Sequence, residues 1–164
     1  SQYMPRAWKP YFRIGQTWQG QNNLPEANKY FRMALKFNPD YSPALSMLGN
    51  NLKRMGNADE AEKMLRAAIR SWPMNKYAYD SLAHVLATLD RRPEAIEMLK
   101  KAISVDPNYG VGHANLAMIY SSLNNNKKSL EHLNRAIQLG VQGPVIDRIK
   151  SIVTQKADQE TDND

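Results

Sequence analysis

The chain has 164 residues, 42% of them hydrophobic and 23% charged, a composition typical of a folded globular protein and not of a disordered chain. It contains no cysteine, which excludes disulfides, thiolate metal ligands and cysteine nucleophiles. The net charge is +6, but four of the 16 acidic residues lie in residues 158–164, so the rest of the chain is strongly basic and suits an acidic partner. Apolar runs of only a few residues predict no transmembrane segment. The lack of a targeting signal leaves the compartment open and slightly favours the cytoplasm.

Residues of one kind recur every 34 positions along the chain. One such column holds proline: Pro5, Pro39, Pro73 and Pro107. Two columns hold small residues: Ala27, Ala61, Ala95 and Ser129, and then Ala34, Ala68, Ala102 and Ala136. A third small column and a large apolar one keep the same period: Gly15, Gly49, Ala83 and Ala117, with Phe31, Leu65, Leu99 and Leu133. Independent columns that agree on one period indicate an internal repeat.

Within each period the apolar spacing predicts two helices. In the first helix of the first repeat, Tyr11, Ile14 and Trp18 fall at i, i+3 and i+7, so we expect all three on one packing face. In the second helix, Ala27 and Phe31 continue the same pattern at a spacing of one turn. We expect the small residues to mark the crossing, where they let the two helices approach closely.

The residues between the helices are polar and carry start and stop signals. Asn23 and Asn57 occupy N-cap positions, each with a glutamate three residues later, so we expect capping boxes there. Pro25 and Pro93 fall in the first turn of their helices, where a missing N–H costs little. We expect the repeat prolines to end the second helices: Pro39, Pro73 and Pro107.

Both ends of the chain extend beyond these repeats. Residues 144–156 predict a final amphipathic helix that covers the last repeat, with apolar residues on one face: Val145, Ile146, Ile149, Ile152 and Val153. The composition of residues 157–164 predicts an acidic, disordered tail. Pro5 is in phase with the repeat prolines, so residues 1–7 are either the end of a preceding repeat, in a chain cut from a longer array, or a lead-in segment.

This 34-residue pattern resembles the tetratricopeptide repeat family, whose motif combines large residues, a Leu-Gly or Leu-Ala step, alanines and a closing proline. The resemblance implies an all-α, right-handed superhelical solenoid of four helix-turn-helix repeats with a C-terminal capping helix. The implied repeats are residues 8–41, 42–75, 76–109 and 110–143. The fourth departs from the motif at its end, where Gly140 breaks the helix and Val141 replaces the proline.

No group of residues in the sequence matches a catalytic or cofactor-binding motif. The glycines are scattered over turns and crossings, and the three histidines, His84, His113 and His132, lack the spacing of metal ligands. We therefore expect no catalytic residue, no metal and no cofactor, and hence no enzyme. We expect His113 to fill a packing position or to contact a partner.

In the tetratricopeptide repeat family, ligands usually lie in the concave groove lined by the first helices. The resemblance implies that the partner-binding residues here are those in the groove columns: Lys9, Phe12, Gln16, Asn50, Lys53, Arg54, Tyr77, Asp80, His84 and Met118. Such a surface suits a protein or peptide segment with apolar anchors and an acidic group. Only Asn50 fits the family's carboxylate clamp, so we do not expect that clamp. Trp8 and Phe12 lie off the packing face and either line the groove or cover the end of the array.

The sequence thus predicts a non-catalytic scaffold or adaptor that binds a protein segment in its groove. One alternative is a regulatory or substrate-recruiting arm of a larger enzyme, such as a glycosyltransferase. Another is a basic binder of nucleic acid or anionic membrane, since the second helices carry a stripe of cations on the expected convex face: Arg32, Lys36, Arg66, Arg70 and Lys100. No exposed aromatics are interleaved to stack bases, so we do not expect nucleic acid to be the main partner. A solvated outer face is the plainer interpretation of the stripe.

Overall fold

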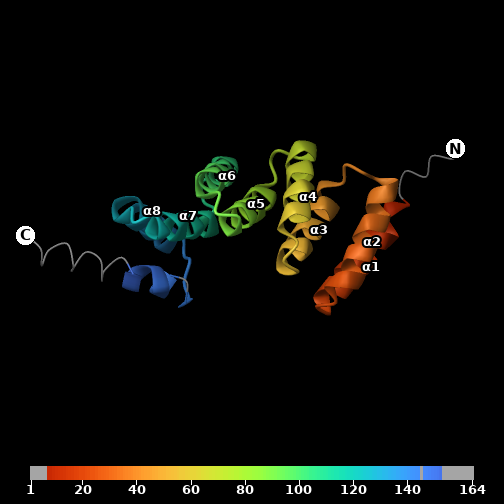
Figure 1. Cartoon of the computed structure of the whole chain (residues 1–164), viewed down its shortest axis with the longest axis horizontal. Coiled ribbons are helices and arrows are strands. Elements are labelled where there is room, and N and C mark those ends of the chain that lie inside the picture. Colours follow the sequence, from red (N-terminus) through yellow and green to blue (C-terminus); the bar gives the residue numbers. More distant parts are fainter. Residues whose placement is uncertain (1–6, 145, 153–164) are drawn as a thin grey trace, which may run out of the picture. The chain divides into compact units, whose positions relative to one another are not determined.

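Helices make up all the regular secondary structure in the residues that the computed structural model describes, 7–144 and 146–152 (Figure 1). Eight of them are α1 (Trp8–Gly20), α2 (Leu24–Phe37), α3 (Ser42–Arg54), α4 (Ala58–Ser71), α5 (Lys76–Thr88), α6 (Arg92–Val105), α7 (Gly110–Ser122) and α8 (Asn126–Gln138). Residues 144 and 146–152 are also helical. The chain divides into unit 1 (Ser1–Asp90), with α1 to α5, and unit 2 (Arg91–Asp164), with the remaining helices. The all-α fold class is confirmed for the part of the chain described.

Unit 1 is built from helices that pack against their neighbours in the sequence. α1 packs on α2 and α3 packs on α4, while α2 also contacts α3, and α5 contacts both α3 and α4. The side chains buried between them belong to the columns of period 34: Ala27, Phe31, Ala34, Ala61, Leu65 and Ala68. Because each repeat presents the same apolar faces, adjacent repeats bury them against one another.

Glycine is required where the paired helices cross. A Cβ atom on Gly15 of α1 would lie 2.7 Å from the ring of Phe31, and one on Gly49 of α3 would lie 2.7 Å from Cγ of Leu65. Carbon atoms in ordinary contact are about 3.5–4 Å apart, so any side chain at these two positions would push the helices apart. The expectation that small residues bring the two helices of a pair together is confirmed here.

The expectation for Ile14 is wrong. Ile14 is 39% exposed, whereas Leu48, at the same position of the next repeat, is 1% exposed. Gly15 is the residue of α1 that faces α2. Ile14 lies on another side of α1, and no described helix precedes α1 to cover that side. The first helix of the array therefore buries a narrower face than the later ones do.

The helix ends follow most of the predicted signals. Asn23 caps α2 through its side-chain oxygen, which accepts a hydrogen bond from the Glu26 amide at 3.3 Å. The cap expected from Asn57 is wrong, because its exposed side chain makes no such bond, and acidic residues in the first turn of α4 favour the positive end of that helix instead. Pro25 and Pro93 do lie in the first turns of α2 and α6. As expected, α2, α4 and α6 each end two residues before a repeat proline: Pro39, Pro73 and Pro107.

The turn inside each helix pair has one residue in the left-handed region of backbone conformation. These residues are again 34 positions apart, with φ between 56° and 82°: Asn22, Gly56, Asp90 and Asn124. Glycine, asparagine and aspartate are the residue types that adopt this conformation most readily. The repeat therefore conserves a turn geometry as well as an apolar pattern within this chain.

Unit 1 also contains buried amide side chains that link its repeats. Gln19 of α1 donates to Asn51 of α3 at 2.8 Å, and Asn51 donates to Asn28 of α2 at 2.9 Å. Asn51 is fully buried and Asn28 nearly so, which makes these bonds costly to break. At the start of α5, buried Asn75 donates to the hydroxyl groups of Ser42 and Ser46 of α3.

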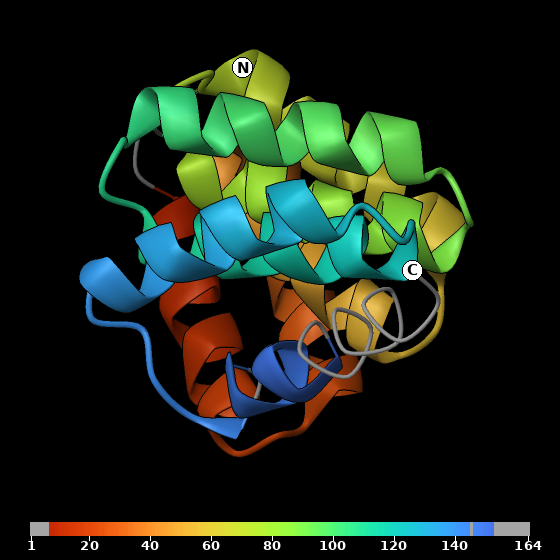
Figure 2. The same cartoon turned by 90° about the vertical axis from the view of Figure 1, so that its left-hand side faces the viewer.

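In unit 2, α7 packs against both α6 and α8 (Figure 2). One core cluster joins α7 and α8 to the helical segment that follows them: Ala114, Ala117, Leu133, Ala136, Ile146 and Ile149. Ile146 and Ile149 are 3% and 2% exposed, so this last segment covers apolar surface of the helices before it. Val145 and Val153, expected on the same face, lie outside the described residues, as do residues 1–6 and the acidic segment 157–164.

Candidate functional site

Polar side chains of α3 and α5, two helices of unit 1 that contact each other, interact electrostatically across the pair: Lys53 with Asp80 and His84. Asn50 and Lys53 are three residues apart on α3, and Asp80 and His84 are four apart on α5, so each pair shares a helical face. Tyr77 lies one turn before Asp80. We refer to these five residues as the α3–α5 face.

The charges of this face are centred on Asp80, whose side chain is only 15% exposed and whose Oδ2 lies 4.0 Å from Nε2 of His84. Burial lowers the pKa of Lys53, while Asp80 opposes this change and Arg54 reinforces it. Burial likewise lowers the pKa of His84, again opposed by Asp80 and here reinforced by Lys53. His84 is therefore neutral at pH 7, and Lys53 and Arg54 together leave one positive charge beyond the single carboxylate.

Two side chains of the α3–α5 face can contact a ligand directly. Asn50 is half-buried, and its amide makes no hydrogen bond within the described part of the chain. An amide can donate and accept at once, so it can pair with a peptide bond. Tyr77 is 62% exposed, with Nζ of Lys76 5.2 Å from its ring centroid. An exposed tyrosine of this kind is a frequent anchor in protein interfaces.

The aromatic residues of α1 belong to the packing of unit 1. The ring of Trp8 lies 4.0 Å from that of Tyr41, and the ring of half-buried Phe12 lies 5.0 Å from Tyr41 and 5.8 Å from Phe31. Tyr41 directly precedes α3, so these contacts tie α1 to the next repeat. These contacts cover part of the Phe12 ring, so it offers a ligand less surface than the expected position of Phe12 in the concave groove implies.

Four more expected groove residues fall outside this set of five: Lys9, Gln16, Arg54 and Met118. Lys9 and Gln16 are exposed on α1. Arg54, at the end of α3, donates to Oδ1 of Asn22 in the turn between α1 and α2 at 2.5 Å. Met118 is 39% exposed on α7 and belongs to unit 2. Of the expected residues, Lys53, Asp80 and His84 interact electrostatically with one another, and Asn50 and Tyr77 share helix faces with them by their spacing.

A histidine pair in unit 2 was missed by the sequence analysis. Nδ1 of His113 on α7 lies 3.0 Å from Nδ1 of His132 on α8, and the Tyr120 ring stacks on His132 with an interplanar angle of 6°. Burial is the main cause that lowers the pKa of both histidines. A signal existed, because His113 and His132 replace apolar residues of earlier repeats, Tyr79 and Met98.

The cation stripe of the second helices is partly neutralised in unit 1. Arg32 of α2 bonds to Glu60 of α4 at 2.8 Å, and Arg66 bonds to Glu62 on its own helix at 2.7 Å. Paired arginines offer less positive potential to a nucleic acid or an anionic membrane. This pairing weakens the case for the basic stripe as a general binding surface.

Other kinds of site find little support among residues 7–144 and 146–152. No group of three or more potential metal ligands occurs there, and no helix there is both long and apolar enough to cross a membrane. A shallow hollow of about 460 Å³ lies beside the turn between α3 and α4, lined by Gly56, Asn57, Ala58, Asp59, Glu60 and Leu89. None of the expected groove residues lines this hollow.

Comparison with known proteins relates the chain to a repeat family. Two sequence profiles, both described as tetratricopeptide repeat, match residues 19–84 in one case and residues 77–109 and 112–139 in the other. These matches overlap both units and include most of the helices. No match is found among curated protein sequences.

Three solved structures illustrate the likeness in fold. MamA from Desulfovibrio magneticus RS-1 matches with a TM-score of 0.75 and 22% identity, over 82% of this chain and 76% of that one. PilF from Pseudomonas aeruginosa matches with a TM-score of 0.83 and 16% identity, over 96% and 72%. A thermophilic tetratricopeptide repeat protein from Thermus thermophilus matches with a TM-score of 0.74 and 22% identity, over 91% and 80%. At these identities the likeness concerns the fold alone.

Proposed function

The chain belongs to the tetratricopeptide repeat family, whose repeats are generally non-catalytic protein-interaction scaffolds, and we propose that it binds an extended protein segment on the α3–α5 face of unit 1. The observation that supports this most strongly is the half-buried amide of Asn50, which makes no hydrogen bond within the described residues. Because this amide is partly exposed, a ligand would replace the water bound to it, and such an exchange gains about 1 kcal/mol.

The chemistry of the face suggests what the segment carries. Its backbone pairs with the Asn50 amide, and an apolar or aromatic side chain packs on the exposed ring of Tyr77. An acidic side chain lies near Lys53 and Arg54, whose combined charge exceeds that of Asp80. The ligand is therefore an extended segment that combines an apolar anchor with an acid.

The same residues do not suggest catalysis. Asp80 and His84 are an acid and a base on one helix face, with Oδ2 4.0 Å from Nε2, but no group of three or more potential metal ligands accompanies them in the described residues and the sequence has no nucleophile motif. Their shared role is electrostatic, since Asp80 offsets the positive charge of Lys53. We propose accordingly that the chain binds its partner without acting on it chemically.

The test begins with affinity capture from the source organism's own extract, followed by mass spectrometry and titration of the captured partner. We expect Asn50→Ala and Tyr77→Ala each to weaken binding by about 1 kcal/mol or more. Lys36→Ala and Lys63→Ala are the matched controls, because both are exposed lysines on second helices that form no ion pair within the described residues. Arg32 is less suitable as a control, because it is bound to Glu60.

Circular dichroism of each variant checks that the fold is intact. If the lysine variants lose affinity and the Asn50 and Tyr77 variants keep it, the partner binds the second helices and the proposal fails. If all four variants bind as the unchanged protein does, the contact lies elsewhere on the chain.

A further inference from the structure

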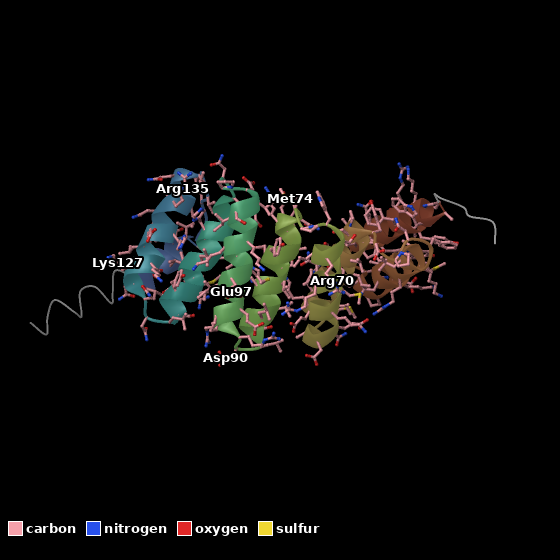
Figure 3. All side chains as sticks on the ribbon, turned by 90° about the horizontal axis from the view of Figure 1, so that it is seen from above. Arg70, Met74, Asp90, Glu97, Lys127 and Arg135 are labelled. Carbon is pink, nitrogen blue, oxygen red and sulfur yellow. The ribbon has the colours of Figure 1, made fainter. Side chains whose placement is uncertain are left out.

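One face of α8 gathers positive charge. Lys128, His132 and Arg135 are spaced at i, i+4 and i+7, so they lie along one side of the helix. Figure 3 labels Arg135 near the end of α8. Two residues of neighbouring helices interact electrostatically with this row, Lys100 of α6 with His132 and His113 of α7 with Arg135. We refer to the five residues as the basic face of unit 2.

The cations of this face have no acidic partner in the part of the chain that the structure describes. Within those residues, none of Lys100, Lys128 and Arg135 forms an ion pair, and Arg135 bonds only to the neutral Oε1 of Gln138, at 3.5 Å. Glu131 is the carboxylate that acts on His132, and it is exposed. The charges of Lys100, Lys128 and Arg135 are thus not neutralised by ion pairs within the described residues, and a ligand of negative charge can neutralise them.

The histidine pair lies within this charge and can take up a proton. The Nδ1 atoms of His113 and His132 are 3.0 Å apart, so one added proton is shared between the two rings. A second added proton would place two positive charges side by side. Burial lowers the pKa of both rings. At His113, His132 and Arg135 reinforce this and a hydrogen bond to the backbone of Pro107 opposes it; at His132, Lys100 and Lys128 reinforce it and Glu131 opposes it. The pair is therefore uncharged at neutral pH and can take up one proton when a negative group approaches.

We propose that the basic face of unit 2 is a second docking surface, which binds an acidic polypeptide segment and couples that binding to uptake of one proton by His113 and His132. The length of the face fits an extended chain. Lys128 and Arg135 are seven residues apart on a helix that rises about 1.5 Å per residue, so they are separated by roughly 10 Å along its axis. About three residues of an extended chain span this distance.

A polypeptide fits this face better than a nucleic acid does. Single-stranded nucleic acids bind by stacking their bases on exposed aromatic rings. Tyr120, beside this face, is 5% exposed and stacked against His132, and the ring of His132 also packs against His113, so these rings offer little surface to a base. Carboxylates need only the charges and N–H donors that the face provides.

The test uses fluorescence anisotropy of the whole chain with a labelled peptide of four Glu-Ser repeats, at pH 7.5 and pH 6.0 and low ionic strength. Glutamate stays ionised at both values, so a change in affinity reports on the protein. We expect binding roughly two- to fivefold tighter at pH 6.0, the range of one exposed charge pair. A peptide of four Gln-Ser repeats should not bind.

Matched variants locate the surface. Lys128→Gln combined with Arg135→Gln should weaken binding roughly fourfold or more, from about twofold for each exposed charge. Lys36→Gln combined with Lys63→Gln removes the same net charge from unit 1 and should leave binding unchanged.

His132→Gln should abolish the difference in affinity between the two pH values. Asn50→Ala should bind the peptide normally, which separates this surface from the α3–α5 face.

Several outcomes would overturn the proposal. Equal losses in the two double variants would show that only net charge matters, and affinity that does not change with pH would remove the histidine pair from the site. Tighter binding of oligothymidylate, or of phosphatidylserine vesicles, through Lys128 and Arg135 would assign the face to nucleic acid or lipid instead. His132→Gln could also loosen α7 from α8, so a thermal melt accompanies it. The exposed Lys128 and Arg135 variants test the surface independently of that packing.

Discussion

In unit 1 two arginines of the second helices are paired with carboxylates, Arg32 with Glu60 and Arg66 with Glu62. In unit 2, Lys128 and Arg135 of α8 form no ion pair within the described residues. Both units bury the same columns of the 34-residue pattern, yet two exposed arginines of the second helices are paired with carboxylates in unit 1, whereas Lys128 and Arg135 of α8 in unit 2 are not. The repeat pattern thus constrains the interior and leaves the surface free to differ.

The interiors also differ in how they are completed. Unit 1 links its repeats through buried amides, with Asn51 bonded to Asn28 and to Gln19. The described core of unit 2 instead draws on the apolar side chains of the segment that follows α8, Ile146 and Ile149. Hydrogen bonds between buried groups demand exact geometry, whereas apolar contacts tolerate small displacements. The comparison suggests that the two units respond differently to substitution, in four ways that can be measured.

The largest expected effect is on the terminal packing of unit 2. Ile149→Ala removes a side chain that is 2% exposed and should cost about 2–5 kcal/mol, since it leaves a cavity against α7 and α8. Hydrogen exchange should show lost protection in α7 and α8 and unchanged protection in α2 to α4. Ile152→Ala, at a half-buried position, is the milder control. Unchanged exchange in α7 and α8 would contradict a covering role for this segment.

A smaller effect is expected where the paired helices cross. Gly49→Ala in unit 1 should destabilise by about 1–3 kcal/mol, because the new methyl group meets Cγ of Leu65 at 2.7 Å. The equivalent position in unit 2 already holds Ala117, and Ala117→Gly should cost only about 0.5–1 kcal/mol, the usual penalty of glycine in a helix. Urea denaturation of both variants measures this. Equal losses of stability in the two variants would mean that α3 and α4 can move apart at Gly49 without an added loss of free energy.

The pH dependence of stability should be stronger in unit 2. The pKa of His84 in unit 1, and those of His113 and His132 in unit 2, lie below the ordinary histidine value near 6.5. As the pH falls, these histidines therefore take up protons more readily in the unfolded chain than in the folded one. Their effect is to keep the free energy of unfolding at its highest above about pH 6.5 and to lower it below that pH. Melting temperatures at pH 7.5 and 5.5 measure this loss. His113→Gln with His132→Gln should reduce it more than His84→Gln, and stabilisation by acid would refute the prediction.

The smallest effect concerns the surface charges. Arg32→Gln breaks the pair with Glu60 and should cost at most about 1 kcal/mol, because both side chains are nearly half exposed. Lys128→Gln removes a cation that has no acidic partner in the described residues but lies 5.3 Å from the ring centroid of Tyr120, so it should cost no more than about 0.5 kcal/mol. High salt should reduce the difference between the two variants, since it screens the exposed pair. If Lys128→Gln proves the costlier change, the contrast between the units is wrong.

The sequence predicted the helix pairs, the small residues at their crossings and the proline stops, because these depend on residues close in the chain and on one repeated apolar pattern. It also placed Asn50 and Lys53 on one helix face and Asp80 and His84 on another, which follows from helical spacing alone. The left-handed turn column was visible in the sequence as Asn22, Gly56, Asp90 and Asn124, although its geometry was not inferred.

The sequence by itself therefore determined which apolar columns are buried and which prolines follow the second helices, apart from local exceptions such as exposed Ile14 and the missing Asn57 cap. Only the tertiary structure decided which polar groups meet: His113 with His132, Asn51 with Asn28, and Asp80 with His84 at a distance too long for a hydrogen bond. Burial of apolar surface has no preferred direction, so a periodic pattern is enough to specify it. A hydrogen bond or an ion pair depends on how far each helix is rotated about its axis and on the reach of each side chain, which helical periodicity does not set.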